Sequence, residues 1–159
     1  MSYPSPLRRS LVLTASSLAL ALGPLCLPAA AEAPQLPQLT ADFSRNEELP
    51  AGEVGGRFAG RGLILDTEGR EIGKMFYDCA TESVHAHTVG AFCTGAIVIP
   101  GRGDIALQGY DPGLPRDADT QGDSFSVAVT GGTGEFKGAE GQANLTHDSR
   151  PATYTITFE

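Results

Sequence analysis

Residues 153–158 read Thr-Tyr-Thr-Ile-Thr-Phe, and residues 124–130 read Ser-Phe-Ser-Val-Ala-Val-Thr. Both stretches alternate apolar and polar residues with a period of two, and both are rich in β-branched and aromatic side chains. This pattern predicts β-strands that each bury one face. Apolar patterns with the period of a helix are hard to find in the rest of the chain, so the two stretches indicate an all-β protein.

Six further segments show the alternation of a strand, at 39–44, 57–66, 71–82, 88–99, 104–110 and 142–147. The links between strands at 67–70, 100–103 and 148–151 are short and rich in turn-forming residues. Short links favour antiparallel neighbours, because a parallel crossover needs about a dozen residues. The longest link, Asp111–Gly122, contains two prolines and is predicted to be a loop at the rim of a pocket.

Eight antiparallel strands without covering helices are compatible with a sandwich or a closed barrel. We predict an eight-stranded antiparallel up-and-down barrel. A barrel of this size has an interior just large enough for one small ligand.

The first 31 residues have the three regions of a signal peptide. Arg8 and Arg9 precede an apolar run at 11–22, and alanines at 29–31 form a cleavage site. A membrane anchor is the alternative, but Gly23 and Pro24 break the apolar run well short of the roughly 20 residues that a span needs. We therefore predict a secreted or periplasmic protein that is exported by the Sec route or, given the paired arginines, by the twin-arginine route.

Cleavage before Glu32 removes 31 of the 159 residues and leaves 128, and the loss of two arginines moves the formal net charge from −8 to −10. We expect a flexible, proline-rich lead-in at 32–38 and a barrel domain at 39–159. A chain this acidic, with its arginines scattered among acids, is not expected to bind nucleic acid or an anionic membrane.

Two cysteines, Cys79 and Cys93, remain after cleavage, with 13 residues between them. In an exported chain this predicts one disulfide across neighbouring strands, worth about 3 kcal/mol in the chain-entropy model. The alternative is a metal site that adds His85 and His87. The chain has no C-x-x-C pattern, and both histidines fall where a hairpin should turn, so no metal is expected.

Residues 131–142 form the densest glycine cluster of the chain. No Gly-Lys-Ser/Thr follows it and no helix pattern opens after it, which argues against a phosphate-binding loop. We predict instead that Gly131, Gly132 and Gly134 supply positive φ angles in a tight structural turn. The other glycines are interpreted as turns and corners of a small barrel.

The stretch at 127–142, Val-Ala-Val-Thr-Gly-Gly-Thr-Gly-Glu-Phe-Lys-Gly-Ala-Glu-Gly-Gln, resembles the strand-turn-strand signature of the allene oxide cyclase and dirigent protein family. Gly103-Asp-Ile-Ala-Leu-Gln-Gly109 and Gly52-Glu-Val54 resemble two shorter segments of the cyclases, and the cysteine pair looks most like exported bacterial members. The resemblance implies an eight-stranded barrel, usually a homotrimer, with an apolar lumen and no cofactor. Members bind a reactive hydrophobic intermediate and direct how it folds.

The catalytic residues of the plant proteins do not transfer to this chain. Asp42 is the nearest acid to the one in the first strand of the cyclases, and Glu140 stands where dirigent proteins have an arginine. We take Asp42 and Tyr77 as catalytic candidates. Asp42 as a solvent-facing acid and Tyr77 as a packed side chain are the alternatives.

Gln108 and Tyr110 are the ligand-binding candidates of the sequence. Gln108 lies on the strand face opposite Ile105 and Leu107, so it points into the pocket only if those two point outward. Tyr110 is a candidate for the lumen or the rim, with surface packing as its alternative.

The sequence therefore predicts an exported barrel that binds a small hydrophobic molecule, as a cofactor-independent cyclase or isomerase or as a protein that directs stereochemistry. One alternative is a non-catalytic secreted binding or envelope protein whose barrel is filled by its own side chains. Another is a partner-binding module, which would carry an exposed apolar face.

Overall fold

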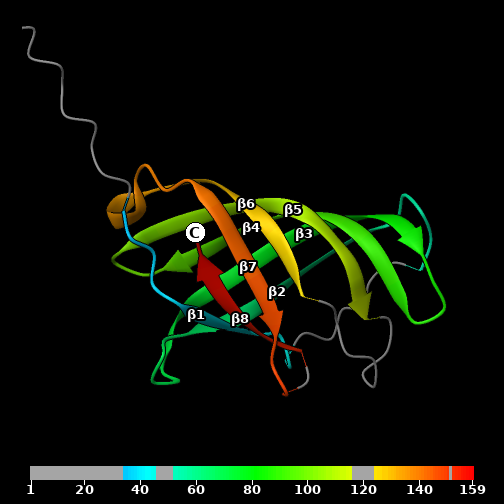
Figure 1. The fold of residues 1–159 in the computed structure, drawn as a ribbon, viewed down its shortest axis with the longest axis horizontal. Coiled ribbons are helices and arrows are strands. Elements are labelled where there is room, and N and C mark those ends of the chain that lie inside the picture. The colour runs from blue at the N-terminus through cyan, green and yellow to red at the C-terminus, as the bar shows by residue number, and fades with distance from the viewer. Residues whose placement is uncertain (1–33, 46–51, 116–123, 151) are drawn as a thin grey trace, which may run out of the picture. The chain divides into compact units, whose positions relative to one another are not determined.

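A computed structural model describes residues 34–45, 52–115, 124–150 and 152–159, so the predicted signal peptide at 1–31 lies outside the described residues. The elements, in chain order, are β1 (Leu39–Asp42), β2 (Arg57–Leu65), β3 (Glu71–Val84), β4 (Thr88–Ile99), β5 (Gly103–Pro115), β6 (Phe125–Gly132), the 3₁₀ turn η1 (Gly134–Phe136), β7 (Gly141–His147) and β8 (Thr153–Phe158). The predicted all-β class is confirmed (Figure 1). Among the described residues, no helix has the length and hydropathy to cross a membrane.

The strands form one closed barrel in which each pairs antiparallel with its neighbours in the chain. The barrel closes between β1 and β8, where Leu39 lies opposite Ile156 and Asp42 lies opposite Thr153. The predicted up-and-down barrel is confirmed, and the sandwich is excluded. An antiparallel barrel of this kind brings the end of each odd-numbered strand and the start of each even-numbered strand to the same rim.

The predicted loop at 111–122 is wrong for its first five residues. β5 continues to Pro115, with Asp111 opposite Ala91 and Pro115 opposite Thr88 on β4. On its other side β5 pairs with β6 only over residues 105–108 within the described part of the chain. Among the described residues no strand pairs with Pro112 or Pro115 on that side, and prolines within sheets are confined to such unpaired positions.

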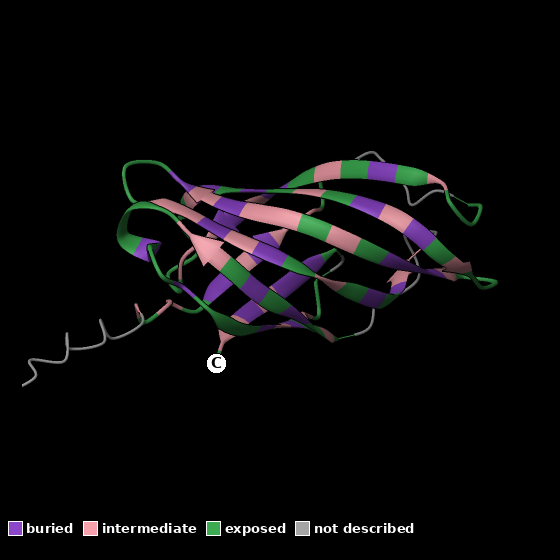
Figure 2. Cartoon of the chain, turned by 90° about the horizontal axis from the view of Figure 1, so that it is seen from above, coloured by how far each residue is buried: buried purple, intermediate pink, exposed green. Residues whose placement is uncertain are grey.

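Alternation along the strands sorts the side chains into an interior and an exterior set, which Figure 2 shows as purple and green bands. The main core cluster contains large aliphatic residues from most strands, among them Leu39, Ile64, Ile97, Ile105 and Ile156. Leu36, in the predicted lead-in, also packs against this cluster.

One end of the barrel is closed by η1, and we call it the η1 end. Phe136 inserts its ring there and is 2% exposed. Of the three glycines predicted for a turn, Gly131 and Gly132 end β6, and Gly134 begins η1 with φ +58°. The positive φ predicted for Gly132 is wrong, and this glycine instead serves close packing, because a Cβ there would overlap the Phe136 carbonyl oxygen.

Candidate functional site at the aromatic end of the barrel

The opposite end of the barrel collects six ring side chains, and we call it the aromatic end. One ring follows β1, and the others lie near the start of β2, in β3, at the start of β6, at the end of β7 and near the start of β8. These rings, the ring cluster, are Phe43, Phe58, Tyr77, Phe125, His147 and Tyr154. Barrel closure brings them together, because the strands that carry them are far apart in the sequence.

The rings contact one another edge to face, the arrangement that aromatic pairs prefer. The Tyr154 ring has its centroid 6.1 Å from those of Phe43 and Phe125 and 5.0 Å from that of His147. The Tyr77 ring lies 5.6 Å from Phe43 and 6.4 Å from Phe58. The contacts form a chain of rings inside the barrel from Phe58 to His147.

Space for one of these rings comes from a glycine inside a strand. A Cβ on Gly62 of β2 would lie 2.5 Å from Cδ1 of Phe43, so the Phe43 ring occupies the place of a side chain. The interpretation of the glycines as turns and corners is therefore wrong for Gly62.

The disulfide predicted between Cys79 and Cys93 is present, and it faces the interior beside the ring cluster. The two cysteines lie directly opposite each other on β3 and β4, with Cα atoms 4.1 Å apart. They pack in a small cluster with Phe58, Ala91 and Tyr77. His85 and His87 lie in the turn between β3 and β4, and no group of three metal-binding side chains occurs in the part of the chain that the structure describes.

Two polar side chains are buried one row beyond the disulfide. Thr81 and Asp111 both lie opposite Ala91, on β3 and β5 respectively, and both are almost fully buried. Asp111 Oδ1 accepts a hydrogen bond of 2.9 Å from the Gly113 N–H. The aromatic end therefore combines apolar rings with an interior hydroxyl and an interior carboxyl group.

Of the residues predicted for the site, Tyr77 lies inside the barrel and belongs to the ring cluster. Asp42 alternates with the buried Leu39 and Ala41, so its side chain lies on the exterior. Its Oδ1 accepts a hydrogen bond of 2.9 Å from the Ser44 N–H. Burial raises the pKa of the Asp42 carboxyl, but the hydrogen bonds from Ser44 and nearby arginine charges outweigh it, and the pKa lies below its ordinary value.

Gln108 and Tyr110 lie on the outer face of β5. Ile105 and Leu107 are buried in the core cluster, which selects the register in which Gln108 points outward. The Tyr110 side chain is 44% exposed, and its hydroxyl lies 3.3 Å from Ser83 Oγ. The structure thus separates Tyr77 from the other three candidates.

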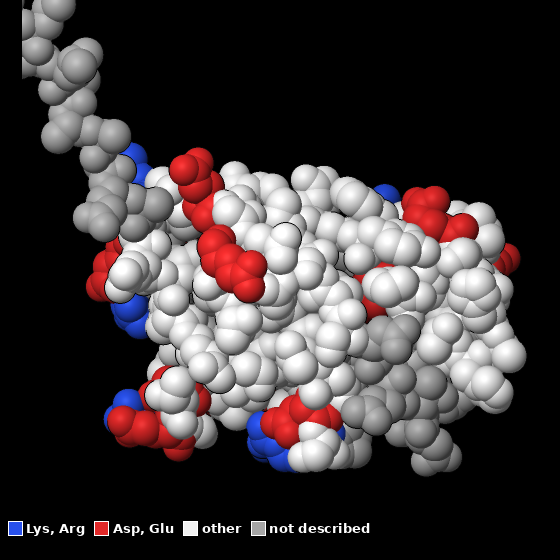
Figure 3. Space-filling model, in the orientation of Figure 1, with Lys and Arg blue, Asp and Glu red and all other residues white. Residues whose placement is uncertain are grey.

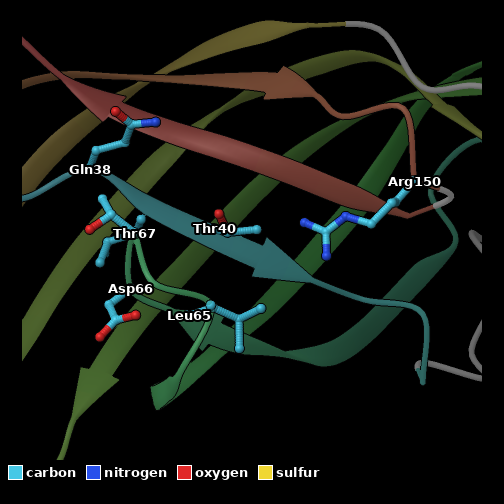
Figure 4. Close-up of a pocket in the computed structure, with 8 residues that line it drawn as sticks. Gln38, Thr40, Leu65, Asp66, Thr67 and Arg150 are labelled. Atoms are coloured by element: carbon cyan, nitrogen blue, oxygen red, sulfur yellow. The ribbon is translucent and has the colours of Figure 1, made fainter.

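A polar pocket of about 280 Å³ lies outside the barrel, over β1 (Figure 4). Its lining residues are Gln38, Leu39, Thr40, Leu65, Asp66, Thr67, Gly69 and Arg150. Its charged groups are already engaged, because Arg150 pairs with Asp148 at 3.0 Å and Asp66 pairs with Arg70 at 2.7 Å. Hydrogen bonds from Arg70 lower the pKa of Asp66. This pocket lies apart from the ring cluster and is the weaker candidate.

The exterior carries a second group of aromatic residues, which we call the outer aromatic face. It consists of Phe76, Phe92 and Tyr110 on β3, β4 and β5, all of them exposed. Phe92 lies directly opposite Tyr110. Figure 3 shows that acidic side chains gather in small groups on the face in view and leave wide uncharged areas between them.

A scan against protein-family models and a search of curated proteins each gave no match. Among solved structures, the chain is similar to pyocyanin demethylase, with a TM-score of 0.55 and 19% sequence identity. The match covers 77% of this chain and 98% of that chain. At this identity the similarity establishes a shared barrel fold.

Proposed function

We propose that this chain is an exported barrel protein that binds a hydrophobic small molecule at its aromatic end. The observation that carries the proposal is the ring cluster, which lines one end of the interior beside the buried Thr81 and Asp111. Small-molecule sites in proteins typically combine apolar and aromatic walls with a few placed polar groups. The name of the structural neighbour, pyocyanin demethylase, supports the idea that this fold acts on small molecules.

The finer proposal follows the resemblance to the allene oxide cyclase and dirigent family. In it the protein is a cofactor-independent cyclase or isomerase, or it directs stereochemistry, by holding one conformer of its ligand away from water. Tyr77 is the catalytic candidate that this proposal retains, because its ring lies in the ring cluster.

Export and assembly belong to the same proposal. The Cys79–Cys93 disulfide supports an oxidising compartment, as expected after removal of a signal peptide. The outer aromatic face supports a subunit contact, because exposed aromatic residues are typical of protein interfaces, and the homotrimer itself follows the resemblance.

A non-catalytic protein with a filled barrel is the second candidate. Contacts among the rings themselves favour it, since Tyr154 touches three other rings and leaves less of its surface for a ligand. In this case the ring cluster would act as a hydrophobic core.

Aromatic NMR spectra of the purified protein distinguish the two candidates, with 2-naphthol as the probe. We expect saturable shifts of the Phe43, Phe125 and Tyr154 ring signals, and unchanged signals from Phe76 and Phe92 on the outer aromatic face. The outer rings are an internal control of equal chemistry. Shifts confined to the outer rings, or no shifts at millimolar probe, would reject the aromatic end as a binding site and leave the filled barrel.

A further inference from the structure

We propose that His147 is the polar anchor of this site, and that the ligand is a flat, neutral, hydrophobic molecule that carries a hydroxyl or carbonyl group. The inference rests on the proposed function, because it names the ligand class and the contact residue of the same site.

His147 is placed on the interior by its strand. It is the last residue of β7 and alternates with the buried Ala143 and Leu145. It lies directly opposite Tyr154 on β8, and the two ring centroids are 5.0 Å apart, closer than those of the Phe43–Tyr77 pair at 5.6 Å. The backbone N–H of His147 donates a hydrogen bond of 3.3 Å to Ser124 Oγ, which ties the end of β7 to the start of β6.

His147 also lies at the boundary between the buried rings and the solvent. Tyr154 is 6% exposed, whereas His147 is half-buried. A ring nitrogen of an imidazole can exchange a hydrogen bond with a ligand hydroxyl, and a protonated ring nitrogen can donate one to a carbonyl. A ligand that lies against the ring cluster would thus meet apolar surface on its flat faces and the imidazole at its edge.

The charges of the described residues favour a neutral ligand over an anion. Every described lysine and arginine is exposed. None of these cations therefore reaches the ring cluster from the described interior. A carboxylate ligand would therefore lose solvation without gaining a cationic partner from the described interior.

The test compares naphthalene with 2-naphthol, which differ by one hydroxyl group. Equilibrium dialysis gives both dissociation constants for the wild type and for His147→Phe, which keeps a ring against Tyr154 but removes both nitrogens. In the wild type we expect 2-naphthol to bind about tenfold more tightly, the size of one hydrogen bond. In His147→Phe we expect this ratio to fall about fivefold or more, with naphthalene binding unchanged, because the hydroxyl is left unpaired.

Two further variants make the comparison specific. His87→Phe, in the exposed turn between β3 and β4, should keep the wild-type ratio. His147→Gln, which keeps a donor and an acceptor, should retain part of it and serves as the second variant where His147→Phe does not fold.

The outcomes separate the two proposals. Equal ratios in the wild type and His147→Phe, with both probes bound, overturn the anchor and leave the proposed function standing. Failure of both probes to bind the folded wild type overturns the proposed function and the anchor with it.

Discussion

The contact between Gly62 and Phe43 offers the sharpest test of how the ring cluster is held in place. In Gly62→Ala the new Cβ would lie 2.5 Å from Cδ1 and 2.6 Å from Cε1 of Phe43, and 3.0 Å from the Asp42 carbonyl oxygen. Real Cβ atoms do not approach other atoms as closely as 2.5 Å, so the Phe43 ring must move. Its displacement breaks the edge-to-face contacts with Tyr77 and Tyr154.

The size of the effect follows from these contacts. Overpacking a well-packed interior costs about 1–3 kcal/mol, and each lost aromatic pair costs about 0.5–1.5 kcal/mol. Replacing glycine by alanine in a strand regains about 0.5 kcal/mol through the unfolded chain. We therefore expect Gly62→Ala to lower the free energy of unfolding by about 2–5 kcal/mol.

A double-mutant cycle assigns this loss to the ring. Urea unfolding is measured for Gly62→Ala, for Phe43→Ala and for both together, with Ile99→Val at the η1 end as the matched control partner for Phe43→Ala. Phe43→Ala removes the clashing ring. The double variant should therefore lose less unfolding free energy than the sum of the two single losses, by at least about 1 kcal/mol. The losses of unfolding free energy for Ile99→Val and Gly62→Ala should be additive. Additive losses for Gly62→Ala and Phe43→Ala would refute the argument that the glycine makes room for the ring.

Two other predictions concern the disulfide and a surface carboxyl group. Replacing both Cys79 and Cys93 by serine should lower the free energy of unfolding by about 3 kcal/mol, since the bridge closes a short loop of the unfolded chain. An unchanged urea midpoint would contradict this. Hydrogen bonds from Arg70 lower the pKa of the Asp66 carboxyl below its ordinary 3.8 in the folded state. The ionised carboxylate therefore stabilises the fold at pH values above the unfolded-state pKa, and this stabilisation is lost as the pH falls through the lower folded-state pKa. Thermal unfolding from pH 6 down to about pH 2 should therefore show a smaller decrease in Tm for Asp66→Asn than for the wild type, and parallel curves would rule out the contribution.

The strands and their closure were predictable because both depend on local patterns. The alternation at 88–99 and 153–158 gives the bounds of β4 and β8, and short turns leave antiparallel pairing as the available topology. The extent of β5 was missed for a physical reason. Pro112 and Pro115 usually end a strand, but they are tolerated here because that part of β5 has no described partner on its β6 side.

The orientation of the strand faces needed more than the pattern. A period of two separates Gln108 from Ile105 and Leu107 but does not say which set lies inside. The ordinary preference of isoleucine and leucine for the core would have selected the observed register. The other register, with Ile105 and Leu107 outward at a subunit interface, is the one that would have turned Gln108 into the pocket.

The ring cluster was missed as a site because none of its members carries a local signal. Phe43 and Tyr154 are more than 100 residues apart in the chain, and they meet only because β1 pairs with β8. His147 was correctly placed at the end of a strand, yet its role depends on Tyr154 lying opposite it on β8. Long-range pairing therefore creates the candidate site, whereas local alternation creates the barrel.

The two ends of the barrel differ in a way that constrains ligand access. At the η1 end the Phe136 ring packs mainly with aliphatic side chains, those of Leu39, Ile99 and Ile105. The ring cluster is continuous with this core, since Tyr154 belongs to the same core cluster and Phe43 and Phe125 pack against it, so a ligand entering at either end displaces packed groups. At the aromatic end the contacts are between rings about 5–6 Å apart, and His147 is half-buried. Rotation of a ring about χ1 and χ2 costs less than moving a strand, so a ligand can replace ring-to-ring contacts with ring-to-ligand contacts of the same kind. Among the described residues, the aromatic end is therefore the end where a ligand of the proposed site can exchange one aromatic contact for another.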